Sequence, residues 1–276
     1  MKDVLTGNFA ARRWDLRPAS VMRVVNWNID RGLRLRGIVD FLDSQNADLL
    51  ILQEVDLNAR RTRRLNIAEE IARRLEMNYV FGWEFQELTQ GSRTSPAYHG
   101  QATLSRWPLE NPRVIRFRHQ SSFWRPRWFL PRTEPFQERI GGRLALVTEI
   151  DVGGKELSVY NLHLESRGNK NLRLSQLEEV LEDAANYPRQ SRALLAGDLN
   201  FDASDAFRPD MTHGLDFRSA IELPSPHTTP ARWLFQRPHT IDWAFVSGPI
   251  RVAHGQVHNM VNASDHYPIS LTIEFS

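Results

Sequence analysis

The positions of apolar residues predict short strands with helices between them. Apolar runs of the length of a buried strand occupy residues 21–29 and 47–55. Segments 35–46 and 65–77 instead place their apolar residues at helical spacing. A strand, a helix, a second strand and a second helix in this order indicate an α/β protein built in layers.

The remainder of the chain adds more strands and one clear helix. Strand patterns occupy residues 78–85, 100–106, 143–152, 155–164, 193–199, 240–247 and 268–275. Gly153 and Gly154 separate two of these runs, and a two-glycine connection between alternating runs predicts an antiparallel hairpin. Residues 171–187 repeat leucine and valine at helical spacing, which predicts an amphipathic helix.

The composition excludes several kinds of chemistry. None of the 276 residues is cysteine, so a thiol nucleophile, a disulfide, an iron–sulfur cluster and a cysteine-ligated zinc are excluded. No stretch reaches the roughly 18 consecutive apolar residues that a membrane span needs. Residues 1–20 contain no apolar core of a secretory signal, and we expect them to be a polar leader. These features favour a cytoplasmic protein without stable membrane insertion.

The arginines are numerous and unevenly placed. Lysine occurs only three times, so 32 of the 35 basic residues are arginine. Eight arginines lie in residues 106–139 against three glutamates, among prolines and tryptophans, although the whole chain has a net charge of only +2. This segment is expected to be an Arg/Trp-rich loop inserted into a strand-rich domain.

Three roles are open for this inserted segment. Arginines interleaved with aromatic residues suit phosphate contacts and base stacking on a single nucleic-acid strand, and the candidates for these contacts are Trp124, Arg125 and Arg127. The same residues could lie on a lipid surface. The segment could also fold over the protein's own sheet, with its tryptophans in the core.

Polar residues follow the ends of several apolar runs. They are Asn28, Asp30, Glu54, His163, Asp198, Asn200 and Asp242, while Asp265 and His266 precede the final run. Strand ends of a layered α/β protein bring together residues that are distant in sequence. Oxygen ligands without cysteine favour Mg²⁺ or Mn²⁺, and such an ion assists the attack of water on a phosphoryl group. No G-x-S-x-G or P-loop motif is present, which disfavours a serine hydrolase or a P-loop NTPase.

Five motifs in order carry a resemblance to a known superfamily. They are NWNID (26–30), LQEVD (52–56), GDLN (197–200), IDWAFVS (241–247) and SDHYPI (264–269). Together they resemble the endonuclease/exonuclease/phosphatase superfamily, which has the fold of DNase I and of the exonuclease III-type AP endonucleases. The resemblance implies a single domain over residues 21–276. Its expected fold is an α/β (α+β) four-layer α/β/β/α sandwich of two mixed β-sheets.

The resemblance also implies residue roles. Asn28, Asp30, Glu54 and Asp265 would surround a Mg²⁺ or Mn²⁺ ion. Asp198 and Asn200 would orient or deprotonate the attacking water and hold the phosphate. His266, oriented by Asp242, would stabilise the phosphate or transfer a proton. His163 would be a second imidazole on the phosphate, and Asn161 could line the same pocket.

A second element suggests a particular branch of the superfamily. NLHLESRG (161–168) lies before a predicted helix with Arg173 and Gln176, and it resembles the tyrosyl-DNA phosphodiesterase branch. In that branch the serine and a nearby arginine contact phosphate, which implicates Ser166 and Arg167. This chain has Leu199 where that branch tends to have threonine, and its spacing from serine to glycine is one residue shorter. These departures leave the substrate open.

We therefore expect a divalent-metal-dependent phosphodiesterase or nuclease, with nucleic acid as the favoured partner and a monomer as the expected state. The alternative within the same fold is a phosphatase or a lipid phosphodiesterase that acts on sphingomyelin or inositol phosphates. A non-catalytic binding module is less favoured, because such modules usually lose a metal ligand or the catalytic imidazole, and all of these are present.

Overall fold

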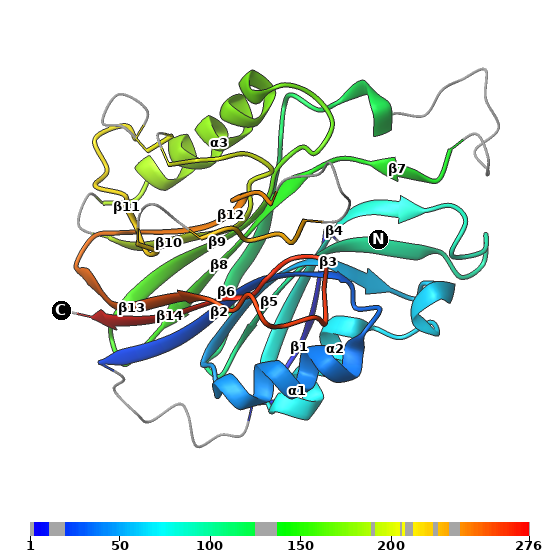
Figure 1. Cartoon of the computed structure of the whole chain (residues 1–276), viewed down its shortest axis with the longest axis horizontal. Helices are drawn as coiled ribbons and strands as arrows, with labels where there is room; N and C mark the ends of the chain where they lie inside the picture. The colour runs from blue at the N-terminus through cyan, green and yellow to red at the C-terminus, as the bar shows by residue number, and fades with distance from the viewer. Residues whose placement is uncertain are drawn as a thin grey trace.

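Two β-sheets pack face to face, with helices on the outside (Figure 1). The structure is a computed structural model that describes residues 3–10, 20–124, 137–188, 191–204, 206–207, 212–222, 226–231 and 238–275. Helices α1 (Leu35–Gln45) and α2 (Ile67–Leu75) cover one sheet, and α3 (Lys170–Ala185) lies on the other. The layers confirm the expected four-layer α/β/β/α sandwich of the DNase I type.

The first sheet has the order β1-β4-β5-β3-β2-β14-β13, and β7 pairs with β4. Its strands are β1 (Val4–Gly7), β2 (Val21–Arg31), β3 (Leu49–Leu57), β4 (Asn78–Glu87), β5 (Ala97–Ser105), β7 (Arg139–Gly141), β13 (Ile250–Val257) and β14 (Ile269–Phe275). Strands β2 and β3 are parallel, and the other pairs are antiparallel.

The second sheet has the order β11-β12-β10-β9-β8-β6. Its strands are β6 (Glu110–Arg116), β8 (Leu144–Asp151), β9 (Glu156–His163), β10 (Arg192–Asp198), β11 (Arg218–Ser219) and β12 (Asp242–Ser247). Here β9 and β10 are parallel, and the other pairs are antiparallel. Both sheets are therefore mixed, as the sequence predicted.

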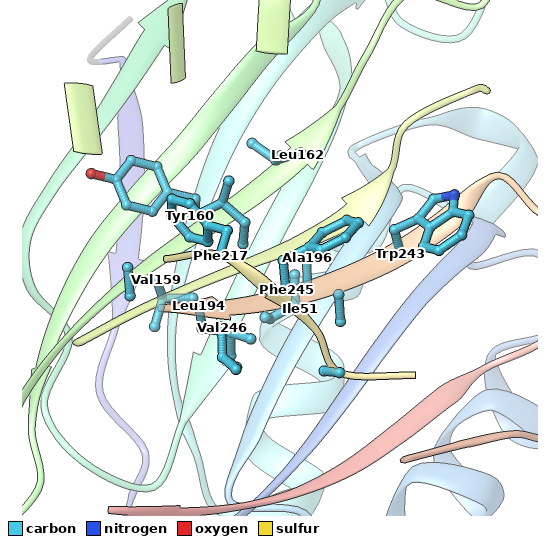
Figure 2. Close-up of a cluster of buried hydrophobic side chains, with 14 of the residues drawn as sticks. Ile51, Val159, Tyr160, Leu162, Leu194, Ala196, Phe217, Trp243, Phe245 and Val246 are labelled. Atoms are coloured by element: carbon cyan, nitrogen blue, oxygen red, sulfur yellow. The ribbon is translucent and has the colours of Figure 1, made fainter. Parts of the chain in front are cut away.

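The continuous apolar runs of the central strands have a simple cause. Along β3, Leu49 and Ile51 face the interior between the sheets, while Leu50 and Leu52 face the helices. A strand that is buried on both faces carries apolar residues at every position. Figure 2 shows Ile51 among the side chains of the second sheet, including Leu194. This double burial fixes the central strands and hence the position of their ends.

Most predicted elements are present within a few residues of their expected bounds. The hairpin at Gly153 and Gly154 is confirmed, because β8 and β9 are antiparallel and both glycines have positive φ, of 64° and 83°. Helices α1, α2 and α3 correspond to the three helical patterns. No helix in the described part of the chain is long and apolar enough to cross a membrane.

Two expectations need correction. Val4–Gly7 forms β1 on β4, although residues 1–20 were expected to be a polar leader. Four residues are too few to show an alternation, and the partner strand is distant in sequence. Glu110–Arg116 forms edge strand β6 where a loop was expected. Its alternation is hidden by polar residues and by Pro112, which lies at a register shift where no ladder bond is needed. Residues 125–136 lie outside the described residues.

Candidate active site

The ends of β2, β9, β10 and β12 meet around Asp198. In the second sheet, Asp198 pairs with His163 on one side and with Asp242 on the other. From the first sheet, the Asn28 Nδ2 donates a hydrogen bond to the Asp198 Oδ2 at 3.1 Å. Gly197 allows β10 to approach β9 closely beside this site: its φ is 155°, and a Cβ there would lie 1.9 Å from the Leu162 carbonyl oxygen.

Asp198 is held by hydrogen bonds and flanked by two imidazoles. Its Oδ1 accepts from the Asn200 backbone N–H at 2.9 Å. The His163 Nε2 lies 3.7 Å from the Asp198 Oδ2, and the His266 Nε2 lies 3.8 Å from the same oxygen. The carboxylate is buried, with 3% of its side chain exposed, so its orientation is fixed by these neighbours.

His266 is oriented by Asp242. The His266 Nδ1 lies 2.8 Å from the Asp242 Oδ2 and 3.1 Å from its Oδ1. Asp242 in turn is fixed through its backbone N–H, which donates to the Thr228 Oγ1 at 3.1 Å. The Trp27 Nε1 donates to the His266 carbonyl oxygen at 2.8 Å. The Trp27 contact therefore fixes the backbone of His266, and the Asp242 contact orients its ring.

The electrostatics of this pair favour a positively charged imidazole. Burial alone would lower the pKa of His266, but the negative charges of Asp242 and Asp198 outweigh it and raise the pKa to about 9. Burial has the opposite effect on the carboxyl of Asp242: it raises the pKa, and the charge of His266 opposes that rise. At neutral pH both ring nitrogens of His266 carry protons, and the Nε2–H faces Asp198.

His163 is held in a different way. Its side chain is buried, and its Nδ1 lies 2.7 Å from the Nη1 of Arg143. The Glu84 Oε1 is farther from the same nitrogen, at 3.4 Å. Neither Arg143 nor Glu84 was among the residues predicted from the sequence. The signal in the sequence was weak: Glu84 is an acidic residue inside an apolar strand, and Arg143 directly precedes one.

Three of the predicted polar residues have left-handed backbone conformations. The φ angles are 43° at Asp30, 52° at Glu54 and 56° at Asn200. Asp30 and Glu54 lie where the β2–β3 and β3–β5 registers shift. Such bulges turn a side chain out of the regular alternation, and strained backbone of this kind is concentrated at functional sites.

Glu54 is set up as an ionised carboxylate. Burial acts to raise its pKa, but the nearby His99 and Arg31 outweigh burial, and the pKa of Glu54 lies well below its usual range. The Arg31 guanidinium also bridges two carboxylates, at 2.5 Å from the Asp30 Oδ1 and 3.7 Å from the Glu54 Oε2. A guanidinium between them indicates that this pair stabilises positive charge, so the donor set fits a divalent cation.

The predicted metal ligands surround the site without forming a closed cluster. Ser264 ties the turn of Asp265 to β2, because its hydroxyl donates to the Asn28 carbonyl oxygen at 2.6 Å and lies 3.2 Å from the Asp265 Oδ1. Among the described residues, the acidic and histidine side chains whose ligand atoms all lie within 4.8 Å of one another are Asp198, Asp242 and His266. The metal-binding role of Asn28, Asp30, Glu54 and Asp265 stays a prediction.

Asn161 was predicted to line the substrate pocket, and the structure gives it another place. Its Nδ2 donates to the carbonyl oxygens of Leu52 and Ala102, and its Oδ1 accepts from the Gln53 Nε2 at 2.8 Å. The side chain is fully buried. Asn161 therefore joins the two sheets, and its contact with substrate stays a prediction.

The other predicted substrate contacts lie on the turn that follows His163. This turn and the neighbouring Phe123 are called the ridge below. Ser166 and Arg167 are exposed, and the Arg167 guanidinium lies over the ring of Phe123 at 5.0 Å. The buried Glu165 joins the two turns, since it accepts from the backbone N–H groups of Ser121 and Arg167. The described part of the Arg/Trp-rich segment thus reaches this ridge. Arg125, Arg127 and the side chain of Trp124 lie outside the described residues.

Comparison with known sequences decides the family. Residues 25–266 match the Endonuclease/Exonuclease/phosphatase family. The chain belongs to this family. A search of curated proteins finds no match.

Solved structures of family members share the fold. A Bacteroides vulgatus endonuclease/exonuclease/phosphatase is 17% identical with a TM-score of 0.67, over 93% of this chain and 99% of that chain. The human Nocturnin catalytic domain with a bound sulfate anion is 19% identical with a TM-score of 0.65, over 93% and 94%. TDP2 from D. rerio, complexed with a single-strand DNA product, is 18% identical with a TM-score of 0.63, over 93% and 100%. At these identities the likeness concerns the fold. Members of the family are phosphoester hydrolases, so the chain has the fold and family of such enzymes.

Proposed function

We propose that this endonuclease/exonuclease/phosphatase protein is a divalent-metal-dependent phosphodiesterase that cleaves nucleic acid. The observation that carries the proposal is the placement of Asp198: a buried carboxylate between two imidazoles, one of them kept positively charged by Asp242. This arrangement suits a reaction that removes a proton from water and places negative charge on a phosphoryl group.

The chain's own residues divide the chemistry as follows. Asp198 accepts the proton of the attacking water, while Asn28 and Asn200 hold its two oxygens in place. The positively charged His266 stabilises the charge that develops on the phosphoryl oxygens, and His163 donates a hydrogen bond from the other side. A Mg²⁺ or Mn²⁺ ion bound by Asn28, Asp30, Glu54 and Asp265 would polarise the phosphoryl oxygen.

The surface around the site favours nucleic acid over other phosphoesters. Arg60, Arg63 and Arg64 are exposed on the loop that follows β3, and the Glu54 position lies on that strand. On the other side, the ridge of Ser166, Arg167 and Phe123 offers cations and an aromatic ring. Positive side chains with an interleaved aromatic suit a phosphate backbone and a stacked base. The single-strand DNA product bound by the D. rerio TDP2 supports the same choice.

Hydrolysis of bis-p-nitrophenyl phosphate tests the catalytic part of the proposal. The wild type is expected to hydrolyse it with Mn²⁺ and to lose activity with chelator. Glu54→Gln should reduce the rate by about 10²-fold or more. Glu110→Gln, which neutralises an exposed carboxylate on edge strand β6, is the matched control and should act like wild type. Equal rates for wild type and Glu54→Gln would contradict the proposal.

A substrate panel tests the nucleic-acid part. Labelled single-stranded DNA, single-stranded RNA, a phosphomonoester, an inositol phosphate and sphingomyelin vesicles should be compared at equal protein concentration. Nucleic acid should give the highest kcat/KM, and that value should fall as salt is raised, because ion release accompanies binding to the backbone. A lipid or a monoester as the best substrate would identify the alternative functions instead.

A further inference from the structure

Arg31 joins two of the carboxylates that the proposed metal site uses. Its Nη1 lies 2.5 Å from the Asp30 Oδ1, and its Nη2 lies 3.7 Å from the Glu54 Oε2. In the sheet, Arg31 pairs with Val55, the residue that follows Glu54. Among the described residues, no other carboxylate forms an ion pair with this guanidinium. The two carboxylates therefore share one cation, and this cation belongs to the chain itself.

A strained turn brings the guanidinium to this place. Asp30, Arg31 and Gly32 are three successive residues with left-handed φ angles, of 43°, 66° and 78°. Glycine is required at the third position, because a Cβ there would lie 2.7 Å from the Ile67 Cγ2. Left-handed backbone is costly for arginine, and residues that are held in it are concentrated at functional sites. The strain at Arg31 therefore points to a task beyond holding the turn.

The bridge is of a kind that another cation can replace. The side chain of Arg31 is 29% exposed, and those of Asp30 and Glu54 are 18% and 19% exposed. Ion pairs that water reaches contribute little to stability, because solvent screens them and ordering a long side chain costs entropy. A divalent ion carries twice the charge of a guanidinium, and two cations at one pair of carboxylates repel each other. Arg31 and a divalent ion therefore compete for the same oxygens.

We infer that Arg31 is an internal cation that competes with the divalent ion for Asp30 and Glu54 and is displaced when the ion binds. The inference rests on the proposed function, because it needs the metal site that this function includes. The number of uncompensated ligand charges sets the affinity of such sites, so an arginine that neutralises part of the charge weakens binding. The displaced side chain turns toward the solvent that it already reaches. Arg31 thus makes loading of the site depend on the concentration of the ion.

Calorimetric titration with Mn²⁺ in the absence of substrate tests the competition. Arg31→Gln removes the charge and should lower the Kd for Mn²⁺ by about tenfold. Arg31→Gly also removes the charge and relieves the left-handed backbone, so it should fold at least as well as wild type and show the same gain. Arg36→Gln is the matched control: it removes an exposed arginine that pairs with Asp40 on α1, and it should leave the Kd unchanged.

Chemical modification of the wild type tests the displacement. An arginine reagent such as p-hydroxyphenylglyoxal, followed by peptide mass spectrometry, measures how accessible each guanidinium is. Arg31 should react at least about twice as fast with saturating Mn²⁺ as with chelator, because the ion shifts the side chain to its released position. Arg36 should react at the same rate in both conditions. An Arg31 rate that Mn²⁺ does not change would overturn the displacement.

The titrations separate failure of this inference from failure of the proposed function. Equal Kd values for Mn²⁺ in wild type, Arg31→Gln and Arg31→Gly would overturn the role of Arg31 and leave the metal site in place. A gain of the same size in Arg36→Gln would also overturn it, because the effect would then come from net charge alone. Mn²⁺ binding by none of these proteins would contradict the proposed metal site, and with it the inference.

Discussion

Two histidines stand at nearly the same distance from Asp198 and are prepared for different tasks. The Nδ1 of His266 contacts the Asp242 carboxylate at 2.8 Å, whereas the Nδ1 of His163 contacts the Arg143 guanidinium at 2.7 Å and lies 3.4 Å from the Glu84 carboxylate. The Asp242 carboxylate raises the pKa of His266 and favours its charged ring, whereas His163 lies between a cation and a carboxylate. The two imidazoles therefore differ in the groups that contact their Nδ1 atoms, although their Nε2 atoms lie at nearly the same distance from Asp198.

Replacing each histidine by glutamine should give the largest difference between them. A glutamine amide can donate a hydrogen bond but cannot carry a positive charge. His266→Gln should therefore lower kcat by about 10³-fold, and His163→Gln by about tenfold. Steady-state hydrolysis of bis-p-nitrophenyl phosphate with Mn²⁺ measures both. Equal losses in the two variants would contradict the different roles assigned to the two histidines.

Asp242→Asn should make His266 resemble a histidine without an acidic partner. In metal-free wild type, an NMR titration of His266 should have its midpoint near 9, and the variant should move the midpoint to lower pH. The pKa of His266 is raised on folding from an ordinary value of 6.5. The stabilisation from this shift is therefore fully present below about pH 6.5 and is lost as pH rises toward 9.

Urea unfolding checks the same point independently. The free energy of unfolding of the wild type should fall between pH 6.5 and 9, and the fall should be smaller in Asp242→Asn, because only Asp198 then raises the pKa of His266 substantially. Asp216→Asn, which removes an exposed carboxylate, serves as the control. A midpoint for His266 that is the same in wild type and Asp242→Asn would refute the assigned role of Asp242.

Asn161 lies two residues before His163 and should affect stability rather than chemistry. Asn161→Leu leaves the Leu52 and Ala102 carbonyl oxygens without their amide donor. Each unpaired buried group costs about 1–3 kcal/mol, so the free energy of unfolding should drop by a few kcal/mol. The kcat of the folded fraction should stay close to that of wild type. A large loss of kcat with unchanged stability would instead place Asn161 in the substrate pocket.

Arg167 and Phe123 should give the smallest effects. Arg167→Ala and Phe123→Ala each remove one exposed contact, and base stacking on an aromatic contributes about 1–3 kcal/mol at most. Binding of single-stranded DNA, measured by fluorescence anisotropy with catalytically inactive protein, should weaken by about three- to tenfold. Arg251→Ala, at an exposed arginine paired with Glu274 on the β13–β14 edge, should leave binding unchanged. Unaltered affinity in the ridge variants would remove this ridge from the proposed binding surface.

Strong local patterns explain which parts could be predicted from the sequence. The central strands and three helices have apolar residues at every position or at helical spacing, and the residues at the strand ends follow from them. Strands β1 and β6 were not predicted, because an edge strand needs few apolar residues and its partner is distant in sequence. Arg143 and Glu84 were not predicted for a related reason: their contacts with His163 form only when the two sheets pack together.

The most direct measurement is single-turnover cleavage of labelled single-stranded DNA with Mn²⁺ by wild type and by Asp198→Asn. Asp40→Asn, at an exposed position on α1, is the control. Loss of the carboxylate that accepts the water proton should lower the rate constant by about 10³-fold while the control keeps wild-type activity. Equal rate constants for wild type and Asp198→Asn would contradict the account.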